Sequence, residues 1–149
     1  VGGSGNGLMG SFFNNQFFTD AAATRTFSSI DLNWGMDFPV SQIRSATGWS
    51  ARWTGFLRLV NSASSMYSFY LNTGFGGGRL YVANKLVIDS TNMTNDYKSG
   101  GEFSGSVSLS SNVVYDVSVE YVAASAPAYV TLSYSSYSQD KIIWYGVVQ

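Results

Sequence analysis

Carboxylates are the candidate groups for catalysis or metal binding in this sequence, because its 149 residues include no histidine and no cysteine. Without an imidazole or a thiolate, the chain has no base for a Ser-His-Asp triad and no nitrogen or sulfur ligand for zinc. Catalysis by a pair of carboxylates is the remaining option. The nine acidic residues are scattered along the chain, at Asp20, Asp31, Asp37, Asp89, Asp96, Glu102, Asp116, Glu120 and Asp140.

Two of these acids lie four residues apart in one segment of alternating apolar residues. We expect Asp116 and Glu120 to share the polar, solvated face of a single strand. Solvated carboxylates lack the tuned environment that acid–base catalysis requires. The sequence therefore predicts a protein that is not an enzyme.

Oxygen donors for a hard cation such as calcium cluster near residue 90. Asp89, Asn92, Asn95 and Asp96 are weak candidate ligands, together with loop carbonyl groups. Clustered Asp and Asn residues usually build turns, so we expect no metal and no other cofactor, with calcium as the alternative. Asn92 also begins Asn-Met-Thr, an N-glycosylation sequon, although a chance triplet explains it equally well.

Aromatic side chains, which make up 16% of the chain, offer a second binding chemistry because they stack on sugar rings. Most are expected in the core, since aromatic residues bury large areas and favour strands. The candidates for a ligand-binding surface are Phe75, at the tip of a glycine-rich loop, and Tyr70 and Tyr81, opposite the apolar faces of their strands. Packing of Phe75 against an adjacent loop is an equally good explanation.

A hairpin at residues 78–89 is the element that must position several of these residues. Apolar and polar residues alternate on both sides of a turn at Asn84, and a period of two is typical of strands. Asn84 suits the left-handed backbone conformation of a tight turn. The preceding loop, residues 72–78, contains four glycines, which allow the backbone to approach another segment closely.

Short alternating segments recur along the whole chain, and no apolar repeat of helical period persists. We predict strands within residues 8–18, 30–34, 49–61, 66–71, 103–109, 113–122 and 129–134, with 137–149 as an edge strand or docked tail. Residues 19–29, with three consecutive alanines, are predicted to form a short helical turn or a loop. This pattern favours an all-β, antiparallel two-sheet β-sandwich.

The predicted sandwich forms one domain over residues 8–149, preceded by a flexible glycine-rich arm at residues 1–7. Its predicted core contains Trp53, Leu57, Phe69, Leu80, Val82, Ile88, Val117, Val119 and Leu132. Only 11% of the residues are charged, and the net charge is −1. Such a surface has no basic field to attract nucleic acid, and no apolar stretch is long enough for a membrane-spanning helix.

Six ordered blocks of the sequence resemble the PA14 domain family, whose members occur in adhesins, flocculins, glycosidases and surface proteins. The blocks are residues 7–13 (GLMGSFF), 50–57 (SARWTGFL), 67–69 (YSF), 79–89 (RLYVANKLVID), 115–121 (YDVSVEY) and 128–134 (AYVTLSY). The resemblance covers nearly the full length and implies the β-sandwich of that family, in agreement with the alternation of the residues.

One departure from the family pattern affects the expected function. In lectin-type members, two consecutive aspartates joined by a cis peptide bond precede a Gly-x-Arg-Leu segment and hold calcium. Phe75 and Gly76 occupy the matching positions here, and neither side chain can ligate a hard cation. The calcium-dependent sugar site of those relatives is therefore not expected in this chain.

These observations favour a non-catalytic, extracellular or cell-surface interaction module that works by protein–protein contact. Low charge favours association between copies, so a self-assembling subunit of a surface layer or filament is one form of this hypothesis. The alternative is a carbohydrate-binding adhesin with a non-standard or calcium-independent site around Phe75 and Tyr81. The expected partners are proteins, including copies of the chain itself, or glycans, and not nucleic acid or membrane.

Overall fold

The computed structural model describes residues 7–58, 65–91, 101–137 and 139–144, and this part of the chain is built from strands and turns without helices. No helix of the described residues is therefore long and apolar enough to cross a membrane. The strands are β1 (Leu8–Phe13), β2 (Ala21–Phe27), β3 (Asp31–Gly35), β4 (Trp49–Arg58), β5 (Ser65–Thr73), β6 (Gly77–Val82), β7 (Lys85–Asp89), β8 (Gly101–Leu109), β9 (Val114–Ala123), β10 (Ala128–Ser136) and β11 (Gln139–Ile143).

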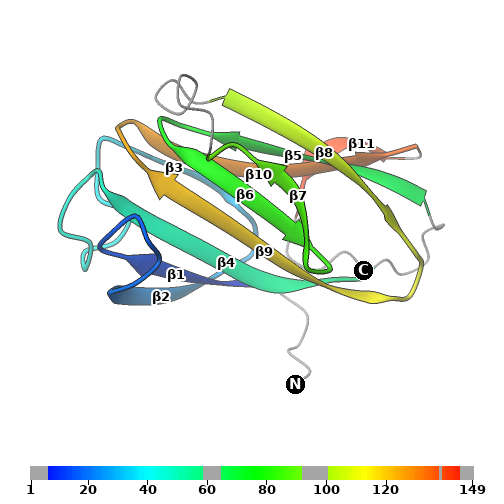
Figure 1. The fold of residues 1–149 in the computed structure, drawn as a ribbon, viewed down its shortest axis with the longest axis horizontal. Coiled ribbons are helices and arrows are strands. Elements are labelled where there is room, and N and C mark those ends of the chain that lie inside the picture. Colours follow the sequence, from blue (N-terminus) through cyan, green and yellow to red (C-terminus); the bar gives the residue numbers. More distant parts are fainter. Residues whose placement is uncertain (1–6, 59–64, 92–100, 138, 145–149) are drawn as a thin grey trace.

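The strands form two antiparallel sheets that pack face to face (Figure 1). The six-stranded sheet has the order β2-β1-β4-β9-β6-β7, and the five-stranded sheet has the order β11-β10-β5-β8, with β3 paired to β10. This architecture confirms the predicted all-β sandwich. The predicted hairpin is strands β6 and β7, and both turn residues, Ala83 and Asn84, have positive φ angles of 52° and 63°.

The core between the sheets contains every residue that the sequence assigned to it, and each of them is at most 3% exposed. Trp53 lies at the centre of an aromatic cluster. Its ring stacks on Trp34, with centroids 6.4 Å apart, and meets Phe12 and Phe27 edge-on at 6.1 Å. The inward-facing residues of both sheets therefore share one hydrophobic interior.

The prediction for residues 19–29 was wrong, because most of this segment forms strand β2 at the edge of the six-stranded sheet. Alanine favours helices, but β2 pairs with β1 from Ala21 to Phe27. Ala22 and Phe27 also pack against the core. Tertiary pairing and burial therefore override the local propensity of the three alanines.

Candidate functional site

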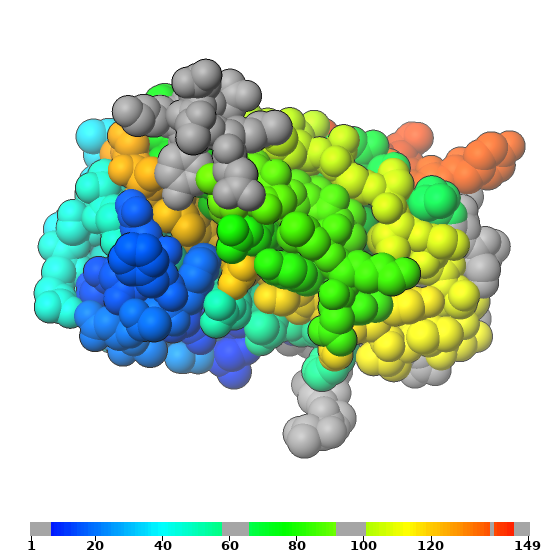
Figure 2. All heavy atoms as spheres, viewed as in Figure 1, coloured from blue at the N-terminus to red at the C-terminus, as the bar shows by residue number. Residues whose placement is uncertain are grey.

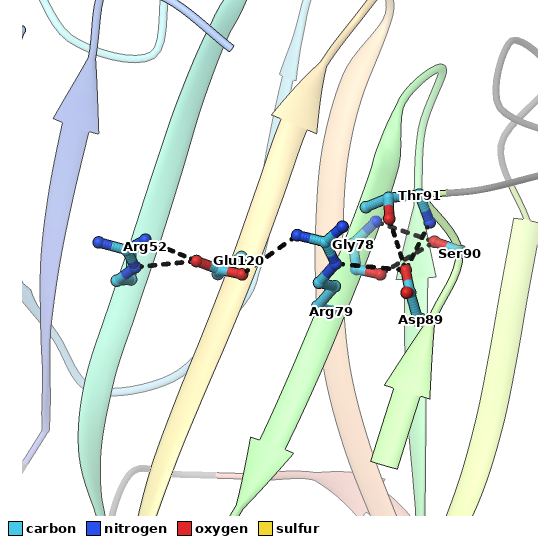
Figure 3. A network of polar contacts seen from close by, with 7 residues as sticks. All are labelled: Arg52, Gly78, Arg79, Asp89, Ser90, Thr91 and Glu120. Carbon is cyan, nitrogen blue, oxygen red and sulfur yellow. Dashed lines mark hydrogen bonds and ion pairs between the residues drawn. The ribbon is translucent and has the colours of Figure 1, made fainter. Parts of the chain in front are cut away.

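A row of four charged side chains crosses the outer face of the six-stranded sheet (Figure 3). Arg52 of β4 lies opposite Glu120 of β9, which lies opposite Arg79 of β6, which lies opposite Asp89 of β7. Successive residues of a strand point to opposite faces. Because the neighbouring Trp53 and Leu80 point into the core, this charged row points away from it.

The charges of this row alternate in sign and sum to zero. Glu120 Oε2 accepts hydrogen bonds from Arg52 Nε at 3.0 Å and from Arg52 Nη2 at 2.6 Å. Arg79 reaches both acids, with Nη1 3.8 Å from Glu120 Oε1 and Nε 3.4 Å from Asp89 Oδ1. The Arg52 guanidinium also lies 4.8 Å from the ring centre of Phe18. The row is thus held by contacts among its own members, and the Phe13 and Phe18 rings lie beside Arg52.

The structure corrects one prediction about the two acids of β9. Asp116 is exposed as expected, but Glu120 is only 8% exposed and is not solvated. The register places an arginine on each side of Glu120, and the guanidinium nitrogens of these arginines lie 2.6 Å and 3.8 Å from its carboxylate oxygens. Glu120 is thus a member of a structural ion-pair network between neighbouring strands.

We expect Glu120→Gln to lower the free energy of unfolding by about 1–3 kcal/mol, because it weakens hydrogen bonds to a charged and largely buried group. Asp116→Asn is the matched control on the same strand and face, and it should change stability by less than about 0.5 kcal/mol. Urea unfolding at neutral pH measures both values. Equal effects of the two substitutions would show that the row does not stabilise the fold.

Asp89 ends the row beside the polar turn that follows β7. Burial acts to raise the pKa of Asp89, but hydrogen bonds from the Thr91 hydroxyl and backbone N–H, and then the Arg79 charge, outweigh it and hold that pKa below its usual value. Ser90 secures the neighbouring strand, since its Oγ accepts a hydrogen bond from the Gly78 N–H at 2.8 Å. The Ser90 N–H also donates to the Gly78 carbonyl at 2.9 Å, so the side chain and the backbone of Ser90 anchor this end of the row to β6.

The lowered pKa of Asp89 predicts a pH dependence of stability. A carboxyl group with a lowered folded-state pKa stabilises the fold above its unfolded pKa of about 3.9, and this contribution is lost as pH falls through the folded-state pKa. The stability difference between wild type and Asp89→Asn should therefore shrink below about pH 4. Urea titrations between neutral pH and pH 3 test this, and a constant difference would contradict it.

The glycine-rich loop that contains Phe75 is fixed against the start of β10 and the turn that precedes it. The Gly74 N–H donates to the Tyr129 carbonyl at 2.8 Å, and the Ser125 N–H donates to the Phe75 carbonyl at 2.8 Å. A Cβ atom on Gly76 would lie 1.8 Å from the Val122 carbonyl oxygen. The backbone at this position therefore has no room for the second aspartate of the lectin-type pair.

The expectation that the chain binds no calcium stays a prediction. The described residues contain no group of three or more Asp or Glu side chains that could hold a metal, and the cis peptide bond among them is Ala126–Pro127. Asn92, Asn95 and Asp96 lie outside the described residues, so their metal binding and the Asn92 sequon stay predictions. Residues 1–6 of the predicted arm also lie outside them.

The three candidate aromatic residues do not form one site. Phe75 is partly buried in its loop, and Tyr81 lies on the outer face of the six-stranded sheet, opposite Leu86 in register. Tyr70 lies on the other sheet, where its hydroxyl is 2.9 Å from Ser135 Oγ and Lys141 Nζ lies 4.5 Å from its ring centre. The roles of these three residues in binding stay predictions.

Sequence reasoning missed a set of apolar side chains on the outer face of the six-stranded sheet. Met9, Phe56, Leu86 and Val114, called here the outer patch, are each about half exposed, between 49% and 58%. Figure 2 shows this face, with the β6–β7 hairpin in green near its centre. Phe56 could have indicated this surface in the sequence. Because Trp53 and Leu57 of the same strand point inward, Phe56 must point outward.

Comparisons with known proteins agree with this architecture. The model of the PA14 domain family matches residues 4–143. The anti-sigma-I factor RsgI3 of Acetivibrio thermocellus is 33% identical over 136 residues, which are 91% of this chain and 20% of that protein. This chain therefore spans about a fifth of the length of that curated relative.

Solved structures give the same fold. An anti-sigma factor domain-containing protein has a TM-score of 0.85 and 33% identity, over 95% of this chain and 46% of that chain. A second one, from Clostridium clariflavum, has a TM-score of 0.83 and 32% identity, over 96% of this chain and 47% of the other. The PA14 sugar-binding domain from an RTX adhesin shares the fold at 14% identity, with a TM-score of 0.66 over 93% and 94% of the chains. The protein described here belongs to the PA14 domain family.

Proposed function

We propose that this domain is a non-catalytic recognition module that binds another protein through the outer face of its six-stranded sheet. The outer patch is the observation that supports this proposal, because clustered exposed apolar side chains mark interaction sites on soluble proteins. Met9, Thr54, Ser118, Tyr81 and Leu86 lie in one row across five strands, and Phe56 lies two residues from Thr54. These residues form one continuous strip.

The neighbouring charged row suits a contact surface. Its charges are already paired with one another, so covering it leaves no unpaired charge buried. Apolar area removed from water contributes roughly 25 cal/mol per Å², and the outer patch supplies this area beside the row. The same pairing argues against catalysis by Glu120 and Asp89, because arginines hold these two acids and they are not placed opposite one another for proton transfer.

The relatives suggest where such a module works. The chain is similar to one segment of an anti-sigma-I factor. We therefore extend the proposal: the module is one domain of a larger regulatory protein. In this setting the module recognises a partner on the extracellular side. A surface layer or filament would use the same face for contacts between copies.

Site-specific photo-crosslinking tests the proposal in cells that make the whole protein. A photoreactive phenylalanine analogue at Phe56 should give a covalent protein adduct, because this ring points into the contact. The analogue at Ser108, exposed on the outer face of the five-stranded sheet, is the matched control and should give none. No adduct at position 56, or equal adducts at both positions, would contradict the proposal.

Calcium-independent carbohydrate binding is the second candidate function, and the outer face of the five-stranded sheet favours it. Short hydroxyl side chains flank Tyr70 there, in the rows Ser106-Ser68-Ser135 and Ser104-Tyr70-Ser133, of which Ser133 is buried. Lys141 and Glu102 form an ion pair at 2.7 Å on this face, so their charges neutralise each other. A neutral surface of hydroxyls with one tyrosine suits uncharged, polyhydroxylated ligands.

Affinity electrophoresis on neutral polysaccharides in the presence of a chelator tests this second function. Retardation that Tyr70→Ala abolishes and Phe56→Ala preserves would support it. Retardation lost on adding the chelator would instead indicate a metal-dependent site, and retardation unaffected by Tyr70→Ala would exclude this face.

A further inference from the structure

We infer that the outer face of the six-stranded sheet binds a second copy of this chain, and that a two-fold axis parallel to strands β9 and β6 relates the copies. This inference rests on the proposed function and names its partner. It follows from the order of charges across the face, which is self-complementary under that rotation and not under the other rotation that keeps the strands of the two sheets aligned.

The charged row defines the axis. From β4 to β7 its order is Arg52, Glu120, Arg79 and Asp89, so the signs alternate (Figure 3). A two-fold axis that runs between β9 and β6, parallel to them, places β4 of one copy over β7 of the other. Arg52 then faces the Asp89 of the other copy, and Glu120 faces the Arg79 of the other copy. Each charge of the row therefore faces an opposite charge of the other copy.

The alternative face-to-face rotation has its axis along the row, across the strands. That rotation keeps each strand over its own counterpart, so Arg52 faces Arg52 and Glu120 faces Glu120. Like charges brought together across an interface are strongly unfavourable. The arginines are about a third exposed, with side-chain exposures of 38% and 32%, so their positive ends are available to distinguish the two arrangements.

The same axis brings the apolar residues together. With β4 over β7, Phe56 of one copy lies diagonally over Leu86 of the other, and Met9 lies at the adjacent edge. On the central strands, Tyr81 of one copy faces Ser118 of the other. The contacts occur twice because the interface is isologous. One rotation thus pairs the charged row and brings Phe56 and Leu86 of the outer patch together.

Low overall charge favours association of identical chains. The net charge is −1, with eight basic and nine acidic residues, so two copies do not repel one another at long range. The axis aligns the strands of the two facing sheets, and aligned face-to-face packing is a common arrangement of sheets. The charges set the orientation, and the apolar side chains supply most of the affinity.

Sedimentation velocity over a range of concentrations tests the inference, with variants designed for the contact between positions 56 and 86. Phe56→Lys and Leu86→Glu should each raise the dimer dissociation constant at least about tenfold, since a charge replaces an apolar contact. Both sites are half exposed, so the variants should fold, which circular dichroism checks. Ser108→Lys, on the opposite face, should leave the dissociation constant unchanged.

Mixing the two charged variants tests the axis itself. An equimolar mixture should form a heterodimer, because the introduced lysine of one chain then meets the introduced glutamate of the other. The second copy of this contact keeps its original pair, Phe56 with Leu86. Disruption by each variant without recovery in the mixture would overturn the inferred axis. A dimer insensitive to both variants would overturn the inferred face.

The photo-crosslinked adduct at position 56 separates failure of this inference from failure of the proposed function. An adduct with twice the mass of the whole protein supports a second copy. An adduct with a different protein, together with a monomer in sedimentation, overturns the second copy and leaves the proposed function standing. A monomer that gives no adduct overturns both.

Discussion

Trp53→Ala is expected to lower the free energy of unfolding by about 3–5 kcal/mol, the cost of removing a large aromatic side chain from a packed core. Trp53 is fully buried between the sheets and touches Phe12, Phe27 and Trp34. Its indole N–H has no hydrogen-bond partner among the described residues. The loss is therefore one of packing, and a cavity replaces the ring at the centre of the cluster.

Urea unfolding followed by circular dichroism measures this loss. Phe56→Ala is the matched control, because Phe56 lies three residues along the same strand with its ring on the opposite face, half exposed. We expect the control to cost less than about 1 kcal/mol. Similar losses at positions 53 and 56 would mean that the strand does not bury the face assigned to it.

Gly76→Asp is expected to lower the free energy of unfolding by at least about 2 kcal/mol and to create no calcium site. The new Cβ would lie 1.8 Å from the Val122 carbonyl oxygen and 3.2 Å from the Ala124 nitrogen. Both neighbours are backbone atoms of β9 and the following turn, so neither can rotate away as a flexible side chain would. The loop must move and lose its hydrogen bonds to Ser125 and Tyr129.

Phe75→Asp is the matched control for this prediction, because Phe75 is partly exposed and carries a side chain already. It should cost less than Gly76→Asp in the same unfolding experiment. Isothermal titration of the double variant with calcium completes the test. A stable double variant that binds calcium tightly would show that the loop, despite its contacts, accepts the acid pair.

Much of the fold could be predicted from the sequence, because burial of one face of a strand produces an alternation of apolar and polar residues. Trp53, Leu57, Leu80 and Val82 alternate with polar or exposed residues, so their positions in the core followed from the period of two. The sequence of strand β2 does not show this alternation. Its side chains are mostly exposed, and its conformation depends on pairing with β1, which local sequence does not encode.

The candidate surface could be predicted only in part, since it depends on register between strands distant in sequence. Glu120 is 68 residues from Arg52, and nothing near either residue indicates that they meet. The strands place Tyr70 and Tyr81 on outer faces, as the sequence predicted. The sequence did not indicate to which sheet each tyrosine belongs. The sheet topology was needed to show that these two tyrosines lie on opposite sides of the molecule.

Methionine oxidation offers the most direct test that this domain works through the outer face of its six-stranded sheet. Met9 lies on that face and Met66 belongs to the five-stranded sheet, and they are similarly exposed, at 49% and 58%. Brief treatment with hydrogen peroxide, followed by mass spectrometry, compares the whole protein in cells with dilute purified protein. We predict that Met9 is protected in cells relative to Met66, because a partner covers it. Equal oxidation of both residues in cells, or protection of Met66 alone, would contradict the account.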